Sequence, residues 1–90
     1  MSVRRNRLEI VNDILKSIQD KGGSIKPTHL LYKSNLSHDR MKSYIAELKE
    51  KGLISEELKA NKKIIVITTK GFEFLVNYKK IKEFEEAFGI

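Results

Sequence analysis

Apolar residues recur at intervals of three and four in the first twenty positions and again near the middle of the chain, which is the spacing of one helix face. The first stripe predicts a helix that starts near Arg7, with Asn6 and Glu9 placed as in a capping box whose Ser or Thr is replaced by Asn. A start near Ser2 is the alternative. The glycine pair 22–23 ends this helix, because glycine accepts the left-handed conformation of a C-cap. The stripe consists of Leu8, Val11, Ile14, Leu15 and Ile18.

A short extended segment, residues 24–26, precedes a second helix that begins at Pro27. The proline ring keeps the preceding residue out of helical angles and suits the first position of a helix. This helix ends at residues 34–35, and Ser37 caps a third helix that runs to about Lys51. The inward face of the third helix consists of Met41, Tyr44, Ile45 and Leu48.

Two strand-like segments follow, ISEELK and KKIIVITT, and the second is rich in β-branched residues. Gly52 ends the helix before them, and the short polar joint at residues 60–62 predicts a β-hairpin. Thr68 then caps a last helix over roughly residues 69–88. Together these elements predict an α+β winged helix-turn-helix, with a three-helix core, a β-hairpin wing and an additional C-terminal helix. We expect one such domain over residues 1–90.

The chain carries a formal net charge of +6, and the distribution of this charge narrows the choice of partner. Residues 1–70 hold 15 lysines and arginines against 8 acidic residues, whereas residues 71–90 hold 3 against 4. The basic excess on the first part favours a polyanionic partner such as nucleic acid. A lysine-rich surface that serves only solubility explains the charge equally well.

The third helix opens with a crowded group of small polar and basic side chains. The N-terminal end of a DNA-reading helix enters the major groove, and its dipole attracts phosphate. Arg40 and Lys42 can contact phosphate or guanine. Asp39 either caps the positive N-terminal end of the helix or accepts a hydrogen bond from a cytosine amino group. The predicted contacts of this helix and of the turn before it are Lys33, Ser34, Asn35, Ser37, His38, Arg40, Lys42 and Ser43.

Basic residues also gather on the predicted wing and at the N-terminus. A basic hairpin tip can lie along the minor groove next to the recognition helix. The simpler interpretation is that turns are polar in any protein. The predicted wing contacts are Lys59, Asn61, Lys62 and Lys63, and the predicted N-terminal contacts are Arg4 and Arg5.

Three motifs make the chain resemble a family of small archaeal winged-helix DNA-binding proteins. They are Tyr32-Lys33-Ser34-Asn35-Leu36-Ser37, Lys51-Gly52-Leu53-Ile54 and Thr68-Thr69-Lys70-Gly71, and the resemblance spans roughly residues 7–78. It implies sequence-specific or general binding to double-stranded DNA, as a transcriptional regulator or a chromatin-type protein. The better-studied relatives are chromatin-associated and dimerise through a long antiparallel C-terminal coiled coil. The last helix of this chain is short for that type of dimer.

The last helix has more apolar residues than one face needs. Phe72, Leu75 and Val76 are predicted to close the core. The other apolar residues form a heptad-like seam of about two repeats, in which one asparagine can fix the register. We predict a homodimer through this seam, and the alternative is that the C-terminal part folds back on its own monomer. The seam comprises Phe74, Asn77, Ile81, Phe84 and Phe88.

Other function classes find little support in the sequence. It contains no cysteine, no apolar run of the ~18 residues that a membrane span needs, and no catalytic or phosphate-loop motif around its two histidines. We interpret Glu56 and Glu57 as solvated charges of a strand. We therefore expect no enzyme, cofactor or metal site, and a soluble cytoplasmic protein associated with the nucleoid. The alternative function is a winged helix that binds another protein in a transcription or RNA-processing assembly.

Overall fold

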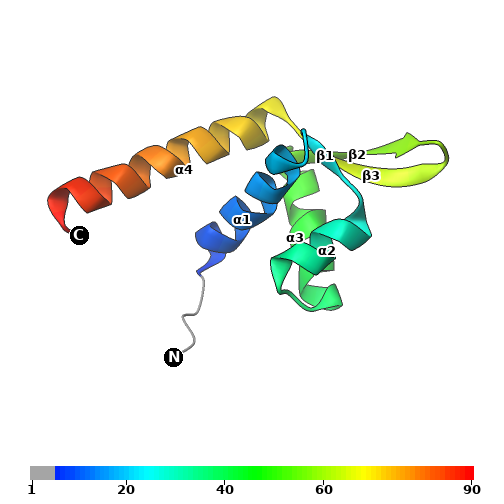
Figure 1. Ribbon diagram of the computed structural model, residues 1–90, viewed down its shortest axis with the longest axis horizontal. Helices are drawn as coiled ribbons and strands as arrows, with labels where there is room; N and C mark the ends of the chain where they lie inside the picture. The colour runs from blue at the N-terminus through cyan, green and yellow to red at the C-terminus, as the bar shows by residue number, and fades with distance from the viewer. Residues whose placement is uncertain (1–5) are drawn as a thin grey trace.

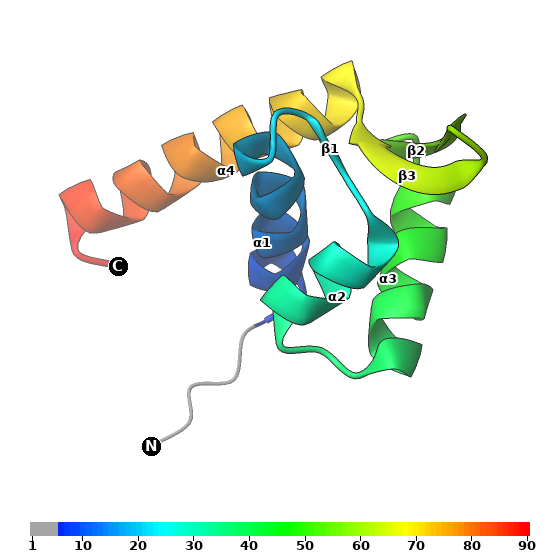
Figure 2. The ribbon, with the colours of Figure 1, turned by 45° about the vertical axis from the view of Figure 1, so that its right-hand side comes forward.

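The computed structural model describes residues 6–90 and confirms the winged helix-turn-helix architecture. The helices pack on one another and on a small sheet, while the wing and the last helix extend to opposite ends of the molecule (Figure 1). Figure 2 shows α2 and α3 beside each other below the sheet. The elements are α1 (Arg7–Asp20), β1 (Ser24–Ile25), α2 (Pro27–Ser34), α3 (His38–Glu50), β2 (Ile54–Lys59), β3 (Lys62–Ile67) and α4 (Thr69–Phe88).

Side-chain caps start the three long helices at the residues that the sequence predicted. Asn6, Ser37 and Thr68 each accept a hydrogen bond from the backbone amide three residues later, over 2.8–3.2 Å. Such bonds satisfy amides that have no partner inside the helix. Gly52, with φ of 77°, ends α3 in the left-handed conformation that was predicted for it. The local sequence therefore fixes where these helices begin and where α3 ends.

The sheet has three antiparallel strands in the order β1-β3-β2, so β3 lies in the middle. The predicted hairpin is confirmed, whereas the pairing of the short segment β1 with β3 was not predicted. The hairpin turn, Ala60 and Asn61, has positive φ at both residues, 52° and 64°. Positive φ at both central positions is characteristic of the type I′ turns that match the twist of a hairpin.

The core lies between α1, α2, α3 and the inner face of the sheet. The inward face predicted for α3 is confirmed, with Met41 and Leu48 buried and Tyr44 and Ile45 half-buried. The stripe of α1 is buried apart from Leu8. The buried apolar residues are Ile10, Val11, Ile14, Leu15, Ile18, Ile25, Leu30, Met41, Leu48, Ile54 and Ile65.

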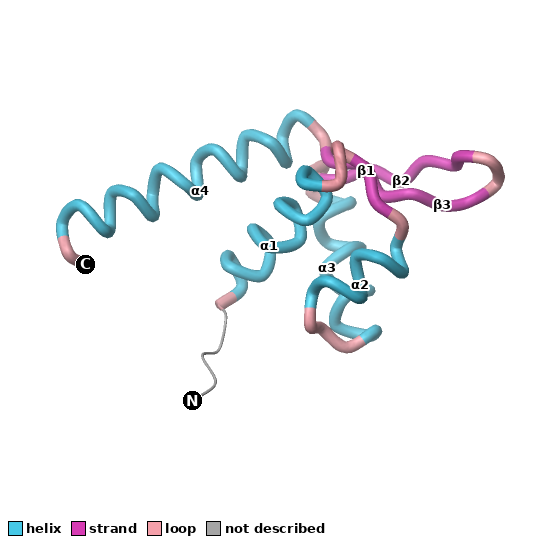
Figure 3. The backbone as a smooth tube through the Cα atoms, in the orientation of Figure 1, coloured by secondary structure: helices cyan, strands magenta, loops and turns pink. Residues whose placement is uncertain are grey.

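Helix α4 joins the core only through its first turns and then runs away from it (Figure 3). Phe74 and Leu75 pack against the core. Phe72 and Val76 are each 46% exposed, so the prediction that they close the core is wrong. The rotation of α4 about its own axis points Phe74, rather than these two residues, inward.

The end of α3 and the start of α4 are joined by a set of contacts that we call the α3–α4 clasp, formed by residues 51–53 and 68–71. Thr68 Oγ1 donates to the carbonyl of Gly52 at 2.6 Å, and Lys70 Nζ donates to the carbonyl of Lys51 at 2.7 Å. The amide of Thr68 donates to the carbonyl of Leu53 at 3.2 Å. Two of the three sequence motifs therefore meet in space.

Candidate nucleic-acid interface

The first half of α3 presents its polar side chains to solvent. His38, Arg40, Lys42 and Ser43 are all exposed, and the buried side of the helix faces the core. Asp39 is exposed as well, with its carboxylate 3.8 Å from His38 Nδ1. No part of the described chain covers this end of α3, so it is free to enter a groove of matching width.

The turn before α3 contains Ser34, which was predicted to contact DNA. Ser34 is only 6% exposed, and its hydroxyl donates to the carbonyl of Leu31 at 3.1 Å and accepts from the amide of Leu36 at 3.3 Å. The predicted DNA contact of Ser34 is therefore wrong, because the hydroxyl stabilises the turn from within. Lys33 and Asn35 beside it are exposed. Asn35 has φ of 57° and ends α2.

On the side of α3 that faces α1, a carboxylate is neutralised by two cations. Glu47 forms ion pairs with Arg7 and with Lys51, the latter at 3.0 Å. The Arg7 guanidinium also lies over the ring of Tyr44, 5.8 Å from its centroid. These contacts hold the start of α1 on α3 and reduce the negative charge that α3 shows to a polyanion.

On the opposite side, a groove separates α3 from the wing. Its floor is apolar and its rim carries the cations Lys42, Lys49 and Lys63. Glu56 lies between two of them, with Oε1 3.1 Å from Lys49 Nζ and Oε2 3.4 Å from Lys63 Nζ. The hydrogen bond from Lys49 is the main cause that lowers the pKa of Glu56 below its ordinary value, and Lys63 adds to it. The interpretation of Glu56 as a solvated charge is wrong, whereas Glu57 is exposed as expected.

The far end of the wing is basic and free of the core. Lys59, Asn61, Lys62 and Lys63, the predicted wing contacts, are all exposed. Leu58, opposite Lys63 in the strand register, is 76% exposed and adds an apolar side chain to this tip. The other predicted basic contacts, Arg4 and Arg5, lie outside the described residues.

A second group of basic residues surrounds α2, and sequence reasoning had singled out only Lys33 among them. Partial burial lowers the pKa of His29 first, and the charges of Lys21, Lys33 and Lys26 lower it further. Tyr32 on the same helix is 91% exposed. Spacing alone gave no signal for this group, because Lys21 and Lys26 flank the turn after α1 rather than lying on α2 itself.

The outer part of α4 leaves apolar side chains in solvent. Ile81, Phe84 and Phe88 are 55%, 60% and 68% exposed, and Asn77 is exposed too. Phe74, the first member of the predicted seam, instead packs on the core and stacks on Tyr78 at 5.9 Å.

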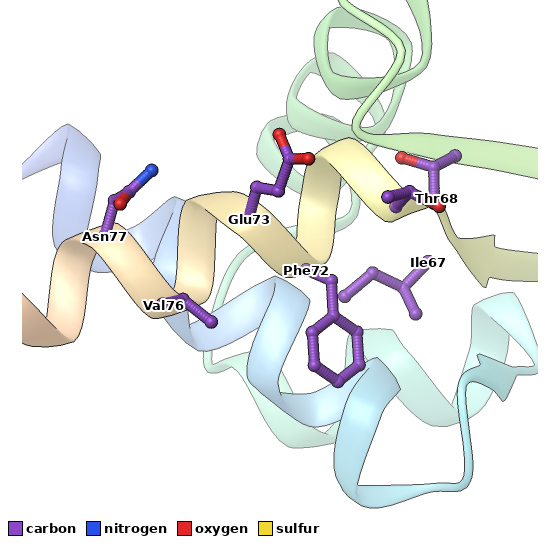
Figure 4. Close-up of a pocket in the computed structure, with 7 residues that line it drawn as sticks. Ile67, Thr68, Phe72, Glu73, Val76 and Asn77 are labelled. Atoms are coloured by element: carbon purple, nitrogen blue, oxygen red, sulfur yellow. The ribbon is translucent and has the colours of Figure 1, made fainter.

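A separate open groove lies at the start of α4, next to the sheet. It is lined by Ile67, Phe72 and Val76, with Thr68, Thr69, Glu73 and Asn77 at its edges. Figure 4 shows the Phe72 ring beside Ile67, with Glu73 and Asn77 projecting to the other side of the helix. With 3.6 residues per helical turn, Phe72 and Val76 therefore lie on a different side of α4 from Ile81, Phe84 and Phe88.

Residues 6–90 contain no group of three or more His, Asp or Glu side chains placed to hold a metal ion. No helix among these residues has the length and apolar character to cross a lipid bilayer.

A helix-turn-helix with an exposed, polar third helix and a basic hairpin beside it defines the class of winged helix-turn-helix proteins. The chain belongs to the winged helix-turn-helix family, whose model matches residues 4–86. The sequence-based assignment to a winged-helix family is therefore confirmed. No curated protein sequence gives a significant match.

Several solved structures share this fold at low sequence identity. Sso10a-2, a DNA-binding protein from Sulfolobus solfataricus, is 21% identical over 93% of this chain and 85% of its own, with a TM-score of 0.78. A winged-helix DNA-binding protein from STIV is 17% identical over 89% and 92% of the two chains, with a TM-score of 0.75. A MarR family transcriptional regulator from Silicibacter pomeroyi is 18% identical, with a TM-score of 0.76. The match spans 90% of this chain but only 56% of the regulator.

Proposed function

We propose that this protein binds double-stranded DNA, with the first half of α3 in the major groove and the wing in the adjacent minor groove. The observation that carries the proposal is the exposure of His38, Arg40, Lys42 and Ser43 at the N-terminal end of α3. A helix fits the major groove, and its first turns are the part that reaches base edges. The names of the similar proteins from Sulfolobus and STIV support the same function. Such a protein acts as a transcriptional regulator or a chromatin-type protein, and a nucleoid location follows from the binding.

The charge pattern agrees with this mode of binding. The cations of the groove rim lie between α3 and the wing, where the phosphate strand that separates the two DNA grooves would run. The exposed lysines of the wing tip extend the same surface. The acidic Glu47 is neutralised by Arg7 and Lys51.

We also propose that the protein binds as a homodimer through α4. The exposed Ile81, Phe84 and Phe88 lie on one side of the helix and form an apolar strip with no cover from the described part of the chain. A 20-residue helix is about 30 Å long, close to the ~34 Å between successive turns of one DNA groove. Two recognition helices joined in this way match a two-fold symmetric site.

The test is the affinity for a labelled duplex at several salt concentrations. With about five phosphate contacts per protomer, log affinity should fall against log salt with a slope near −4 to −5. The double variant Arg40→Ala, Lys42→Ala should bind much more weakly and with a smaller slope, since two phosphate or base contacts are lost. Unchanged binding by this variant would point to the other function, a winged helix that binds a protein.

A further inference from the structure

The Glu56 carboxylate joins three elements of the groove. One oxygen meets Lys49 Nζ on α3, the other meets Lys63 Nζ on β3, and Glu56 itself lies on β2. The Glu56 side chain is 21% exposed, whereas the side chains of Lys49 and Lys63 are 52% and 64% exposed. The anion therefore lies inside the groove, and the two cations reach outward from it.

Glu56 marks the border between the supported and the free part of the wing. On the wing face that looks toward α3, Ile54 at the base is buried and Leu58 near the tip is exposed, and Glu56 stands between them. Among the described residues, the pair of Glu56 with Lys49 is the ion pair that links α3 to the wing. Beyond this link, the basic tip has no support from the helix.

We propose that Glu56 is a positioning residue for DNA binding, which fixes the angle of the wing to α3 and keeps Lys49 and Lys63 side by side at the groove rim. This proposal rests on the proposed function, and it names the residue that makes the recognition helix and the wing one rigid surface. An exposed ion pair contributes little to the stability of a protein, so the expected effect of Glu56 is on geometry more than on folding.

The direction in which DNA affinity changes when Glu56 is replaced distinguishes positioning from a simple effect of its charge. DNA repels a carboxylate, so removing an acidic residue from a DNA-facing surface normally strengthens binding. If Glu56 positions the wing, its removal weakens binding in spite of the lost repulsion. Glu57, on the next position of the same strand, supplies the matched control because it is exposed and has no ion pair among residues 6–90.

The experiment compares Glu56→Gln with Glu57→Gln in the full chain, by fluorescence anisotropy on one labelled duplex at two salt concentrations. We expect Glu57→Gln to bind as tightly as the wild type or slightly more tightly, and Glu56→Gln to bind at least about threefold more weakly than Glu57→Gln. Thermal unfolding should remain nearly unchanged in both variants. Equal or tighter binding by Glu56→Gln would overturn the proposal.

A charge exchange adds a rescue. The double variant Lys49→Glu, Glu56→Lys keeps the total charge and restores an ion pair between α3 and the wing. It should bind DNA more tightly than the double variant Lys49→Glu, Glu57→Lys, which has the same total charge but leaves two carboxylates against each other at the groove. Equal or weaker binding than this control would contradict positioning by Glu56.

A measurement without DNA keeps this proposal separate from the proposed function. Backbone relaxation by NMR should show larger amplitudes at Ala60 and Asn61 in Glu56→Gln than in Glu57→Gln, since the wing loses its link to α3. If the wild type showed no salt-dependent DNA binding, the proposed function would fail, while this comparison would still decide whether Glu56 holds the wing. Equal amplitudes in the two variants would show that it does not.

Discussion

Gly71 lies so close to the carbonyl oxygen of Leu53 that no side chain fits between them. A Cβ atom at Gly71 would collide with this oxygen and would also lie 2.8 Å from Cγ1 of Ile67. Gly71 is buried in the first turn of α4 with ordinary helical angles, so the requirement is one of space and not of conformation. The glycine of the Thr68–Gly71 motif therefore allows α4 to dock against the end of α3.

Replacing Gly71 with alanine should destabilise the protein by about 1–3 kcal/mol, because overpacking forces the backbone of α4 away from Leu53. Intrinsic helix propensity predicts the opposite, a gain of up to about 1 kcal/mol. Urea unfolding followed by circular dichroism decides between the two. Lys80→Ala, at an exposed position of the same helix, is the control and should change stability little. A more stable Gly71→Ala protein would show that α4 is not packed as described.

The wing turn offers a prediction of the opposite sign. Ala60 has φ of 52°, a left-handed conformation that a Cβ atom disfavours by roughly 1 kcal/mol or more. Ala60→Gly should therefore stabilise the protein by about 0.5–1 kcal/mol in thermal or urea unfolding, after the entropy cost of glycine. Asn61→Gly should have a smaller effect, since asparagine tolerates φ of 64°. Loss of stability in Ala60→Gly would argue against this turn.

Phe84 provides the test of the α4 dimer. A glutamate at this position would place charge on the exposed apolar surface, so Phe84→Glu should sediment as a monomer at concentrations where the wild type is a dimer. Lys79→Glu, on the same helix, introduces the same group and should remain dimeric. A wild type that sediments as a monomer would remove the dimer, and with it the two-fold DNA site.

The histidine on α2 predicts how stability depends on pH. Partial burial and three neighbouring lysines hold the pKa of His29 below its ordinary value of 6.5. The unfolded chain then binds more protons than the folded one below pH 6.5, so the contribution of His29 is present above that pH and is lost as pH falls. His29→Gln should lose less stability than the wild type between about pH 7.5 and 5.5. An NMR titration in which His29 shows a pKa at or above 6.5 would contradict this explanation of the pH dependence.

Local sequence signals predicted the elements of this fold because their physics is local. The caps at Asn6, Ser37 and Thr68 depend on an oxygen and an amide three residues apart, and the wing depends on two β-branched or polar runs with a short joint. The exposed start of α3 followed from the same periodicity. These features need no knowledge of the rest of the chain.

The sequence predictions that failed depend on contacts between distant segments. Whether Phe72 or Phe74 faces inward is set by the rotation of α4 against the core, which the Gly71–Leu53 contact imposes. Ser34 was predicted to contact DNA because it lies in the turn before α3, whereas the fold buries its side chain in that turn. Glu56 gains its partners only when the wing folds against α3. In each case the residue type was compatible with two environments, and tertiary packing decided.

The α3–α4 clasp fixes the direction in which α4 leaves the end of the recognition helix. A rotation of this helix, about 30 Å long, by roughly 10° at the clasp moves its far end by about 5 Å. If two copies meet at the C-terminal ends of their α4 helices, substitutions at Thr68 or Lys70 would alter the distance between the two recognition helices. Neither residue needs to contact a base or a phosphate for this effect. Relatives could diverge in the spacing of the operators they prefer while keeping every residue of α3.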